Sequence, residues 1–199
     1  MKLKILGLII AVLLLGSCTA VEDDSTSGSR LQIMSLTGND IEGKAGSTTV
    51  FSDVITNNSI FDDPGVAEIE ALPLDPSLQT ATVSPYMDVL VDQIDVEFRR
   101  TDGRNIEGVD VPVRFTQPVS MLVPILKSSE IPFVLVRHVA KLEAPLFQLR
   151  AIPSQEVVLQ LVAVVTIHGK DGAGNRVAPV TGYISVWCAD FADTEETTT

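Results

Sequence analysis

Val157-Val-Leu-Gln-Leu-Val-Ala-Val-Val-Thr-Ile167 is an almost unbroken run of apolar and mostly β-branched residues. A strand of this composition is apolar on both faces, so the run predicts a central strand that is covered on each side. The turn-forming segment Asp171-Gly-Ala-Gly-Asn175 follows, and a second apolar segment, Val180 to Cys188, then returns. The sequence therefore predicts a β-hairpin in the last third of the chain.

The same period of two recurs upstream of this hairpin. Ile94, Val96 and Phe98 alternate with charged residues, and a turn-rich segment separates them from the second alternating stretch at residues 111–115. Half-buried strands have this pattern, so the two stretches predict another hairpin. Five further strands are expected at residues 31–36, 49–56, 66–72, 120–125 and 133–136. Short strands separated by turns predict an all-β fold, an antiparallel β-sandwich.

Residues 137–149 break the pattern, because their apolar positions recur at helical spacing. We expect one short helix here, interrupted near Pro145, that caps an open end of the sandwich or carries the chain between its sheets. The apolar residues at this spacing are Val139, Leu142, Leu146 and Leu149.

The segment from Thr166 to Asn175, followed by a closing strand, resembles the penultimate hairpin of bacterial immunoglobulin-like and fibronectin-III-like domains. The resemblance covers about thirty residues, and it departs from antibody domains because their Cys pair and intervening Trp are absent. It implies an immunoglobulin-like antiparallel β-sandwich with an adhesion-type or spacer architecture. A fold of this kind does not by itself give a function.

The start of the chain has the features of a secretory signal. Lys2 and Lys4 precede an apolar run, residues 5–15, that is too short to span a bilayer. The run ends in Leu15-Gly16-Ser17-Cys18, which resembles the lipobox of bacterial lipoproteins. The resemblance implies cleavage before Cys18 and a diacylglyceryl thioether on its sulfur. The alternative is an ordinary cleaved signal in which Cys18 has no role.

The lipobox also suggests a domain organisation. Residues 1–17 form the signal peptide, and residues 18–29 are small, polar and acidic, as in a flexible tether. Residues 30–191 form the β-sandwich domain, and residues 192–199 are expected to be a disordered tail. By the same resemblance, Thr19 in place of an Asp favours the outer membrane if the cell is Gram-negative.

The charge of the chain limits its partners. With 14 Lys and Arg against 26 Asp and Glu in 199 residues, the net charge is -12. This balance excludes a sequence-nonspecific nucleic-acid binder and disfavours polybasic docking on an anionic membrane. No hydrolase, zinc-protease or phosphate-loop motif appears, and the two histidines, His138 and His168, belong to no catalytic motif. We therefore expect a protein that is not an enzyme and has no cofactor.

Acidic turns raise the question of calcium, which prefers oxygen ligands. The candidates are Asp102, Asn105 and Asp110 in one loop and Asp171 and Asn175 in another. None has EF-hand spacing, and the chemistry of turns accounts for all five without a metal. The pair Asp62-Asp63 before Pro64-Gly65 likewise predicts a turn.

Alternation along the last strand divides its residues between two faces. Cys188 shares a face with Ile184 and Val186, which predicts a buried free thiol. The only Trp, Trp187, and one of the two Tyr, Tyr183, lie on the opposite face. Aromatic residues with polar tips are favoured at recognition surfaces, so these two are candidate partner-binding residues. The alternative is that the helix or an N-terminal segment covers them.

These features predict a lipid-anchored cell-envelope protein, attached to the membrane through lipidated Cys18. On this interpretation it acts as a non-catalytic binding or structural module for another envelope protein. The alternative is a lipoprotein that binds a small ligand or calcium through the loops of the sandwich. A deep polar pocket or convergent Asp side chains would favour the alternative, and a flat apolar patch or an uncovered sheet edge would favour the first function.

Overall fold

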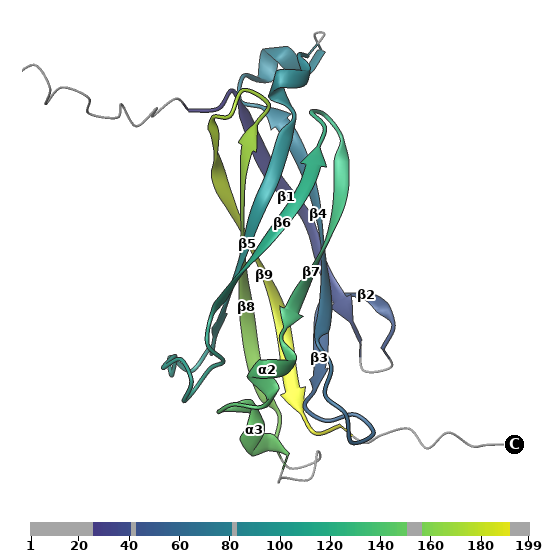
Figure 1. Cartoon of the computed structure of the whole chain (residues 1–199), viewed down its shortest axis with the longest axis vertical. Helices are drawn as coiled ribbons and strands as arrows, with labels where there is room; N and C mark the ends of the chain where they lie inside the picture. The colour runs from purple at the N-terminus through teal and green to yellow at the C-terminus, as the bar shows by residue number, and fades with distance from the viewer. Residues whose placement is uncertain (1–25, 41–42, 81–82, 151–156, 192–199) are drawn as a thin grey trace, which may run out of the picture.

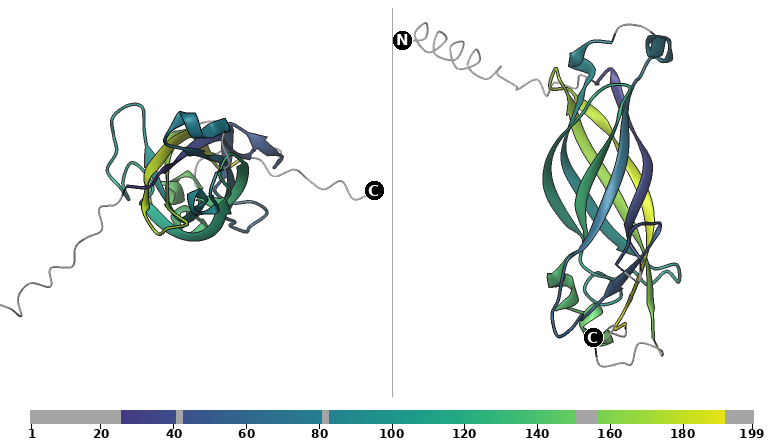
Figure 2. Two further views of the ribbon diagram at one scale, coloured as in Figure 1. Left: turned by 90° about the horizontal axis from the view of Figure 1, so that it is seen from above. Right: turned by 90° about the vertical axis from the view of Figure 1, so that its right-hand side faces the viewer.

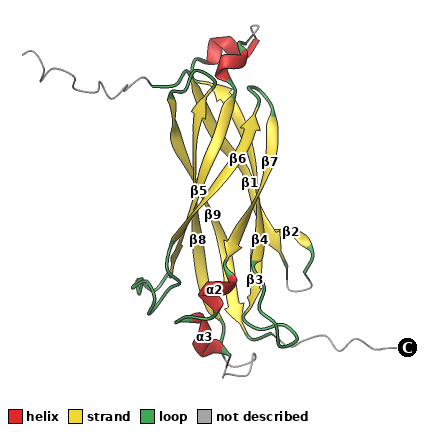
Figure 3. Ribbon diagram, viewed as in Figure 1, coloured by secondary structure: helices red, strands yellow, loops and turns green. Residues whose placement is uncertain are grey.

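Two twisted β-sheets face each other along the long axis of the molecule, with short helices only at its two ends (Figure 1 and Figure 3). This computed structural model describes residues 26–40, 43–80, 83–150 and 157–191. The predicted all-β sandwich is confirmed. The predicted signal peptide, most of the predicted tether with Cys18, and the predicted tail lie outside the described residues.

One sheet has four strands and the other has five. From one edge to the other, the four-stranded sheet consists of β2 (Ala45–Ser47), β1 (Ser29–Asn39), β4 (Asp63–Pro73) and β7 (Ser128–Val136). The five-stranded sheet consists, again from edge to edge, of β3 (Thr49–Asp53), β9 (Arg176–Ala189), β8 (Leu159–Asp171), β5 (Val89–Arg99) and β6 (Phe115–Val123). Each strand is hydrogen-bonded to its neighbours in this order.

The sequence predicted a wholly antiparallel sandwich. The structure differs at one pair of strands, because β3 pairs with β9 in parallel. Thr48 alone separates β2 from β3, and one residue is too short for a hairpin turn. The chain therefore crosses from one sheet to the other at this point. The crossing closes one side of the sandwich.

On the opposite side, β6 and β7 form the facing edges of the two sheets. The side-chain amide of Gln117 spans this gap: its Nε2 donates to the Val134 carbonyl at 2.9 Å, and its Oε1 accepts from the Val134 N–H at 3.0 Å. The Gln117 side chain thus forms the two backbone hydrogen bonds of Val134, at the edge of β7, that a neighbouring strand would otherwise form.

The predicted hairpin in the last third is present, with β8 in the middle of its sheet. Its outer face is not covered by another layer of the described chain, contrary to the expectation for this run. Val164 is buried there, but Val162 and Thr166 are only half-buried. The four-stranded sheet covers only the inner face, and side chains of the neighbouring strands shield part of the outer one.

The hairpin predicted around residues 101–108 also exists, between β5 and β6, but its second strand starts later than expected. Residues 111–114 belong to the loop, and the two predicted stretches 111–115 and 120–125 contribute to one strand. Val111 and Asp110 both donate to the Ile106 carbonyl, so the loop folds on itself. Pro112 has no N–H for a strand ladder, and Val113 is exposed.

Two short helices, α2 (His138–Lys141) and α3 (Leu146–Leu149), replace the single helix predicted at residues 137–149, and the chain is interrupted near Pro145 as expected. Together they cap one end of the sandwich (Figure 2). The apolar residues Leu146 and Leu149 of α3 are buried, but the apolar residues in and just after α2 are not. Val139 and Leu142 are exposed, and Lys141 points inward because an acidic partner lies beneath it.

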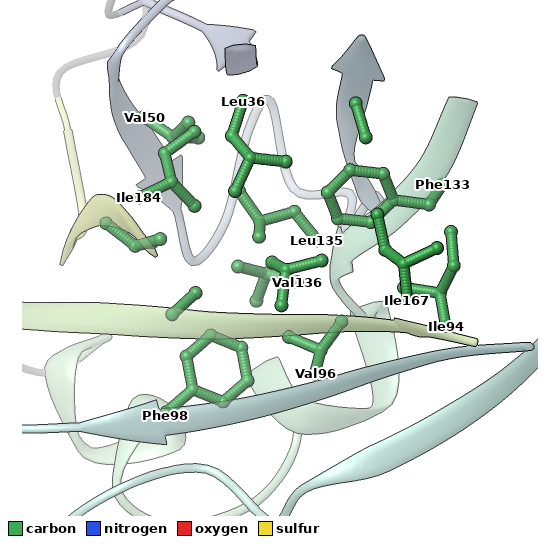
Figure 4. Close-up of a cluster of buried hydrophobic side chains, with 14 of the residues drawn as sticks. Leu36, Val50, Ile94, Val96, Phe98, Phe133, Leu135, Val136, Ile167 and Ile184 are labelled. Atoms are coloured by element: carbon green, nitrogen blue, oxygen red, sulfur yellow. The ribbon is translucent and has the colours of Figure 1, made fainter. Parts of the chain in front are cut away.

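The core fills the space between the two sheets. Figure 4 shows side chains from both sheets meeting there, and they are fully or almost fully buried. Among them are Leu36, Val50, Ile94, Val96, Phe98, Phe133, Leu135, Val136, Ile167 and Ile184.

The folded part begins before residue 30, where the sequence had placed its boundary. Ser27 and Ser29 are buried, and the Ser29 hydroxyl donates to the Met87 carbonyl at 2.7 Å. This hydrogen bond and the burial of both serines hold the segment against the sandwich, so the predicted tether ends at least three residues earlier than residue 29. No helix within the described residues is long and apolar enough to cross a membrane.

The two ends of the molecule carry different elements. At the entry end, where the described chain begins, lie the 3-10 helices η1 (Pro76–Thr80) and η2 (Pro85–Met87) and the β8–β9 turn (Figure 2). At the far end lie α2, α3 and the β5–β6 loop, residues 100–114 (Figure 1).

Candidate functional site: the outer face of the five-stranded sheet

The two predicted partner-binding residues lie on the outer face of β9. Tyr183 is 66% exposed and Trp187 is 36% exposed, whereas Ile184, Val186 and Cys188 point into the core. The division of β9 into two faces was therefore predicted correctly. No helix of the described chain covers Tyr183, so the alternative of a buried pair does not hold for it.

Trp187 belongs to an aromatic cluster with Phe51 and Phe191. Phe51 is its register partner on β3, and the two rings meet edge to face with centroids 5.5 Å apart. The Phe191 ring also contacts Phe51, with ring centroids 5.7 Å apart. Such contacts fix the orientation of the indole while leaving a third of the residue open to solvent.

Tyr183 has an apolar neighbour and charged surroundings. Its register partner on β8 is Val164, and Val164 in turn faces Glu97 on β5. The Arg99 guanidinium donates to Glu97 at 2.8 Å. The face therefore combines exposed aromatic area with polar groups at its border, which is the usual composition of a protein-binding surface.

A polar network occupies the same face nearer the entry end. The Asp95 carboxylate accepts hydrogen bonds from Gln93, Thr116 and His168, the last at 2.8 Å. Partial burial alone would raise the pKa of Asp95, but these hydrogen bonds outweigh it and lower the pKa below its ordinary value. The network borders a shallow depression of about 260 Å³. Because three side chains of the same sheet hold the Asp95 carboxylate, we assign the network a structural role.

The residues considered for calcium do not come together. Asp171 lies beside Val89 at one end of β5, whereas Asp102 follows Arg99 at the other end of this strand. The strand advances ten positions from Val89 to Arg99, which is a distance of about 33 Å. The two loops thus lie at opposite ends of the sandwich and cannot bind one ion.

Each of these candidate residues already forms hydrogen bonds or ion pairs within its own loop. Asp102 forms ion pairs with Arg100 and Arg104, at 2.6 and 2.9 Å. Asn105 accepts from the Arg100 N–H, Asp110 from the Ile106 N–H, and Asp171 from the N–H groups of Ala173 and Asn175. In the part of the chain that the structure describes, no three His, Cys, Asp or Glu side chains are grouped as metal ligands.

The far end contains a buried polar cluster that the sequence did not reveal. Lys141 on α2 is 1% exposed, and its Nζ donates to Asp63 Oδ1 at 2.8 Å. Burial raises the pKa of Asp63, and the positive charge of Lys141 only partly offsets this effect. The second oxygen of Asp63 and the Ser52 hydroxyl are buried in the same cluster, and Ser52 also favours the charged form of the Asp63 carboxyl group.

Cys188 lies next to this cluster and is fully buried, as the alternation of β9 predicted. Burial, together with the charge of Asp63, raises the pKa of its thiol to about 12. The thiol is therefore protonated at neutral pH and packs as a small apolar group.

The Asp62-Asp63 pair, predicted as a turn, instead fixes the helical cap. Asp63 begins β4 and holds Lys141, while Asp62 accepts from the backbone N–H and, at 2.8 Å, the ring Nδ1 of His138. Partial burial alone would raise the pKa of Asp62, but these contacts with His138 outweigh it and lower the pKa. The partners are 76 positions apart in the first pair, Asp62 and His138, and 78 apart in the second, Asp63 and Lys141. No local sequence motif predicts contacts over such separations.

A cleft of about 580 Å³ opens at the entry end, and its volume is in the range of small-ligand sites. Its charged lining consists of Arg30, Asp92, Lys170 and Arg176, with His168 at its border with the sheet face. No local sequence pattern reveals this cleft, because its charged residues come from four different strands.

Comparison with known proteins found no family model and no curated protein that matches this chain.

Proposed function

We propose that this protein is a lipid-anchored protein of the bacterial cell envelope, attached through Cys18, and that it binds another envelope protein without catalysis. The anchor is supported by the basic start, the short apolar run and the Leu-Gly-Ser-Cys sequence at positions 15–18. Two or three acyl chains hold a protein stably on a membrane, whereas one does not. The immunoglobulin-like or fibronectin-III-like resemblance of the β8–β9 hairpin is compatible with a spacer or adhesion role.

The binding surface is the outer face of the five-stranded sheet around Tyr183 and Trp187. The observation that carries this assignment is the 66% exposure of Tyr183 on the same face of β9 as Trp187, whose indole is held by the Phe51 ring. Large aromatic groups that are already oriented lose little conformational entropy on binding, so they are frequent hot spots of protein interfaces.

The anchor is tested by labelling cells with a fatty acid and comparing the wild-type protein with Cys18→Ser. We expect label on the wild-type protein alone. Equal labelling of both proteins would show that Cys18 is not acylated.

The surface is tested by photo-crosslinking in cells, with a benzophenone-bearing phenylalanine at position 183. A matched control carries the same group in place of Met34, which is 51% exposed on the outer side of the other sheet. We expect position 183 to form an adduct with one discrete protein, and Trp187→Ala to abolish that adduct. The same adducts from both positions would contradict a specific face.

A further inference from the structure

The described chain begins at the entry end, beside the cleft. Thr26 pairs with Arg176 in a β-bridge, and the Ser27 N–H donates to the Arg176 carbonyl at 3.3 Å. Thr26 lies eight positions after Cys18, a length of chain that spans at most about 29 Å when fully extended. If Cys18 is lipidated, the entry end is therefore held within this distance of the membrane surface.

The cleft at this end is cationic in an acidic protein. Arg30, Lys170 and Arg176 line it, against the single carboxylate of Asp92. The Lys170 Nζ forms an ion pair with Asp92 Oδ2 at 3.3 Å. Arg30 and Arg176, by contrast, form no ion pair with another described residue. An arginine that is exposed and unpaired keeps its full capacity to bind phosphate oxygens.

Exposed apolar side chains lie around the cleft. Leu74 forms part of its lining and is 58% exposed, and Tyr86 on η2 is 71% exposed. Leu90 and Leu122 face each other across β5 and β6 at the same end, and both are exposed. Apolar groups next to unpaired cations are the combination that favours the interface between lipid head groups and acyl chains.

We propose that the entry end of the sandwich docks on the phospholipid surface to which Cys18 anchors the chain, with Arg30, Lys170 and Arg176 binding lipid phosphate groups. Leu74 and Tyr86 enter the interfacial layer beside them. The inference rests on the proposed lipid anchor, which supplies the proximity, and on the charge complementarity of the cleft.

Docking here fixes the orientation of the molecule. Because the long axis runs from the entry end to the far end, the far end points away from the membrane (Figure 2). The net charge of -12 opposes a general attraction to anionic lipids, so the contact depends on the local cations of the cleft.

The test uses the mature chain from residue 18 with Cys18→Ser, so that binding does not depend on acylation. Its sedimentation with vesicles of phosphatidylethanolamine and phosphatidylglycerol is compared with that of Arg30→Ala/Arg176→Ala. A control, Arg104→Ala/Arg114→Ala, makes the same charge change at the far end, where both arginines are paired with carboxylates. Circular dichroism verifies that each variant is folded.

We expect the Arg30/Arg176 variant to lose affinity for the vesicles about tenfold or more, since each cation near an anionic surface contributes about fivefold. The control pair should bind as the reference protein does. Equal affinity of all three proteins, or no binding of the reference protein, would overturn the proposal. Because acylation has no part in this assay, its outcome is independent of the fatty-acid labelling that tests the anchor.

A second measurement reports which end enters the interface. Tyr86→Trp and, as a control, Ile106→Trp at the far end are each made in a Trp187→Phe background. We expect the emission of the first alone to shift to shorter wavelength on the same vesicles. Binding of glycerol 3-phosphate that needs Arg30 and Arg176, without any vesicle binding, would assign the cleft to a soluble phosphate ester and overturn membrane docking.

Discussion

At the far end of the sandwich Lys141 is buried against Asp63 beneath a helical cap, whereas at the entry end Arg30 and Arg176 are exposed at a cleft, with no carboxylate partner among the described residues. The cations of the β5–β6 loop follow the far-end pattern, since Arg100 and Arg104 both pair with Asp102. At the far end these cations thus form ion pairs with carboxylates of the same chain. At the entry end, Arg30 and Arg176 form no ion pair with another described residue, and we propose that they bind lipid phosphate groups.

The largest effect is expected from breaking the buried pair at the far end. Lys141→Ala leaves the Asp63 carboxylate buried without its partner, and removing one member of such a pair costs about 3–5 kcal/mol of unfolding free energy. Urea denaturation measures this loss. At the entry end, Arg30→Ala/Arg176→Ala should change the same quantity by less than about 0.5 kcal/mol.

The double variant Lys141→Met/Asp63→Leu sharpens this comparison, because it removes both charges together. Its loss of stability should be smaller than that of Lys141→Ala, since no unpaired charge remains buried. If Lys141→Ala cost no more than the entry-end pair of substitutions, the distinction between the two ends would fail.

An intermediate effect is expected from Cys188 at alkaline pH. The folded state keeps the thiol protonated to a pKa of about 12, while the unfolded chain ionises near its ordinary value of 9.0. The unfolded state therefore binds fewer protons between these values, and stability falls as the pH rises, by up to about 1.4 kcal/mol per pH unit. At pH 10.5 this contribution amounts to roughly 2 kcal/mol.

The measurement compares the pH dependence of denaturation for the wild-type protein and Cys188→Ala. We expect the wild-type protein to lose more stability above pH 9 than the variant does. The native thiol should also react with thiol reagents at pH 8 only as fast as the protein unfolds, and rapid labelling of the native protein would show that the far end is open.

The smallest effects are expected in the two acidic loops. Asp171→Ala removes hydrogen bonds to the N–H groups of Ala173 and Asn175 and should cost about 1–2 kcal/mol. Asp102→Ala removes ion pairs that are open to solvent, so its effect should be smaller. Thermal melting measures both.

Because the loops lie at opposite ends, millimolar calcium should leave the melting temperature of the wild-type protein unchanged. An increase that Asp171→Ala abolished would assign a calcium site to that turn.

The β9 strand shows how far the sequence leads toward the candidate site. Alternation placed Tyr183 on the outer face and Cys188 in the core, because a strand fixes the direction of each side chain by a local period of two. The aromatic cluster around Trp187 could not be foreseen in this way. It depends on the parallel pairing of β9 with β3, which brings Phe51 beside the indole from a segment more than 130 positions earlier.

The helical cap shows where local patterns fail. Val139 and Leu142 recur at helical spacing, but both are exposed, because a four-residue helix has no stable face of its own. The contact that orients α2 comes from Asp63, and the charge pair outweighs the burial of two apolar side chains on the same turn.

The sequence by itself determined the all-β class, the positions of most strands, the hairpins in the middle and last third, and the faces of β9, because these follow from local alternation and turn chemistry. Only the tertiary structure decided which loops share an end, that Lys141 turns inward, and that Arg30, Lys170 and Arg176 line one cleft. Those outcomes depend on pairs of residues far apart in the chain, and the order of strands in the sheets, which no local period encodes, brings them together.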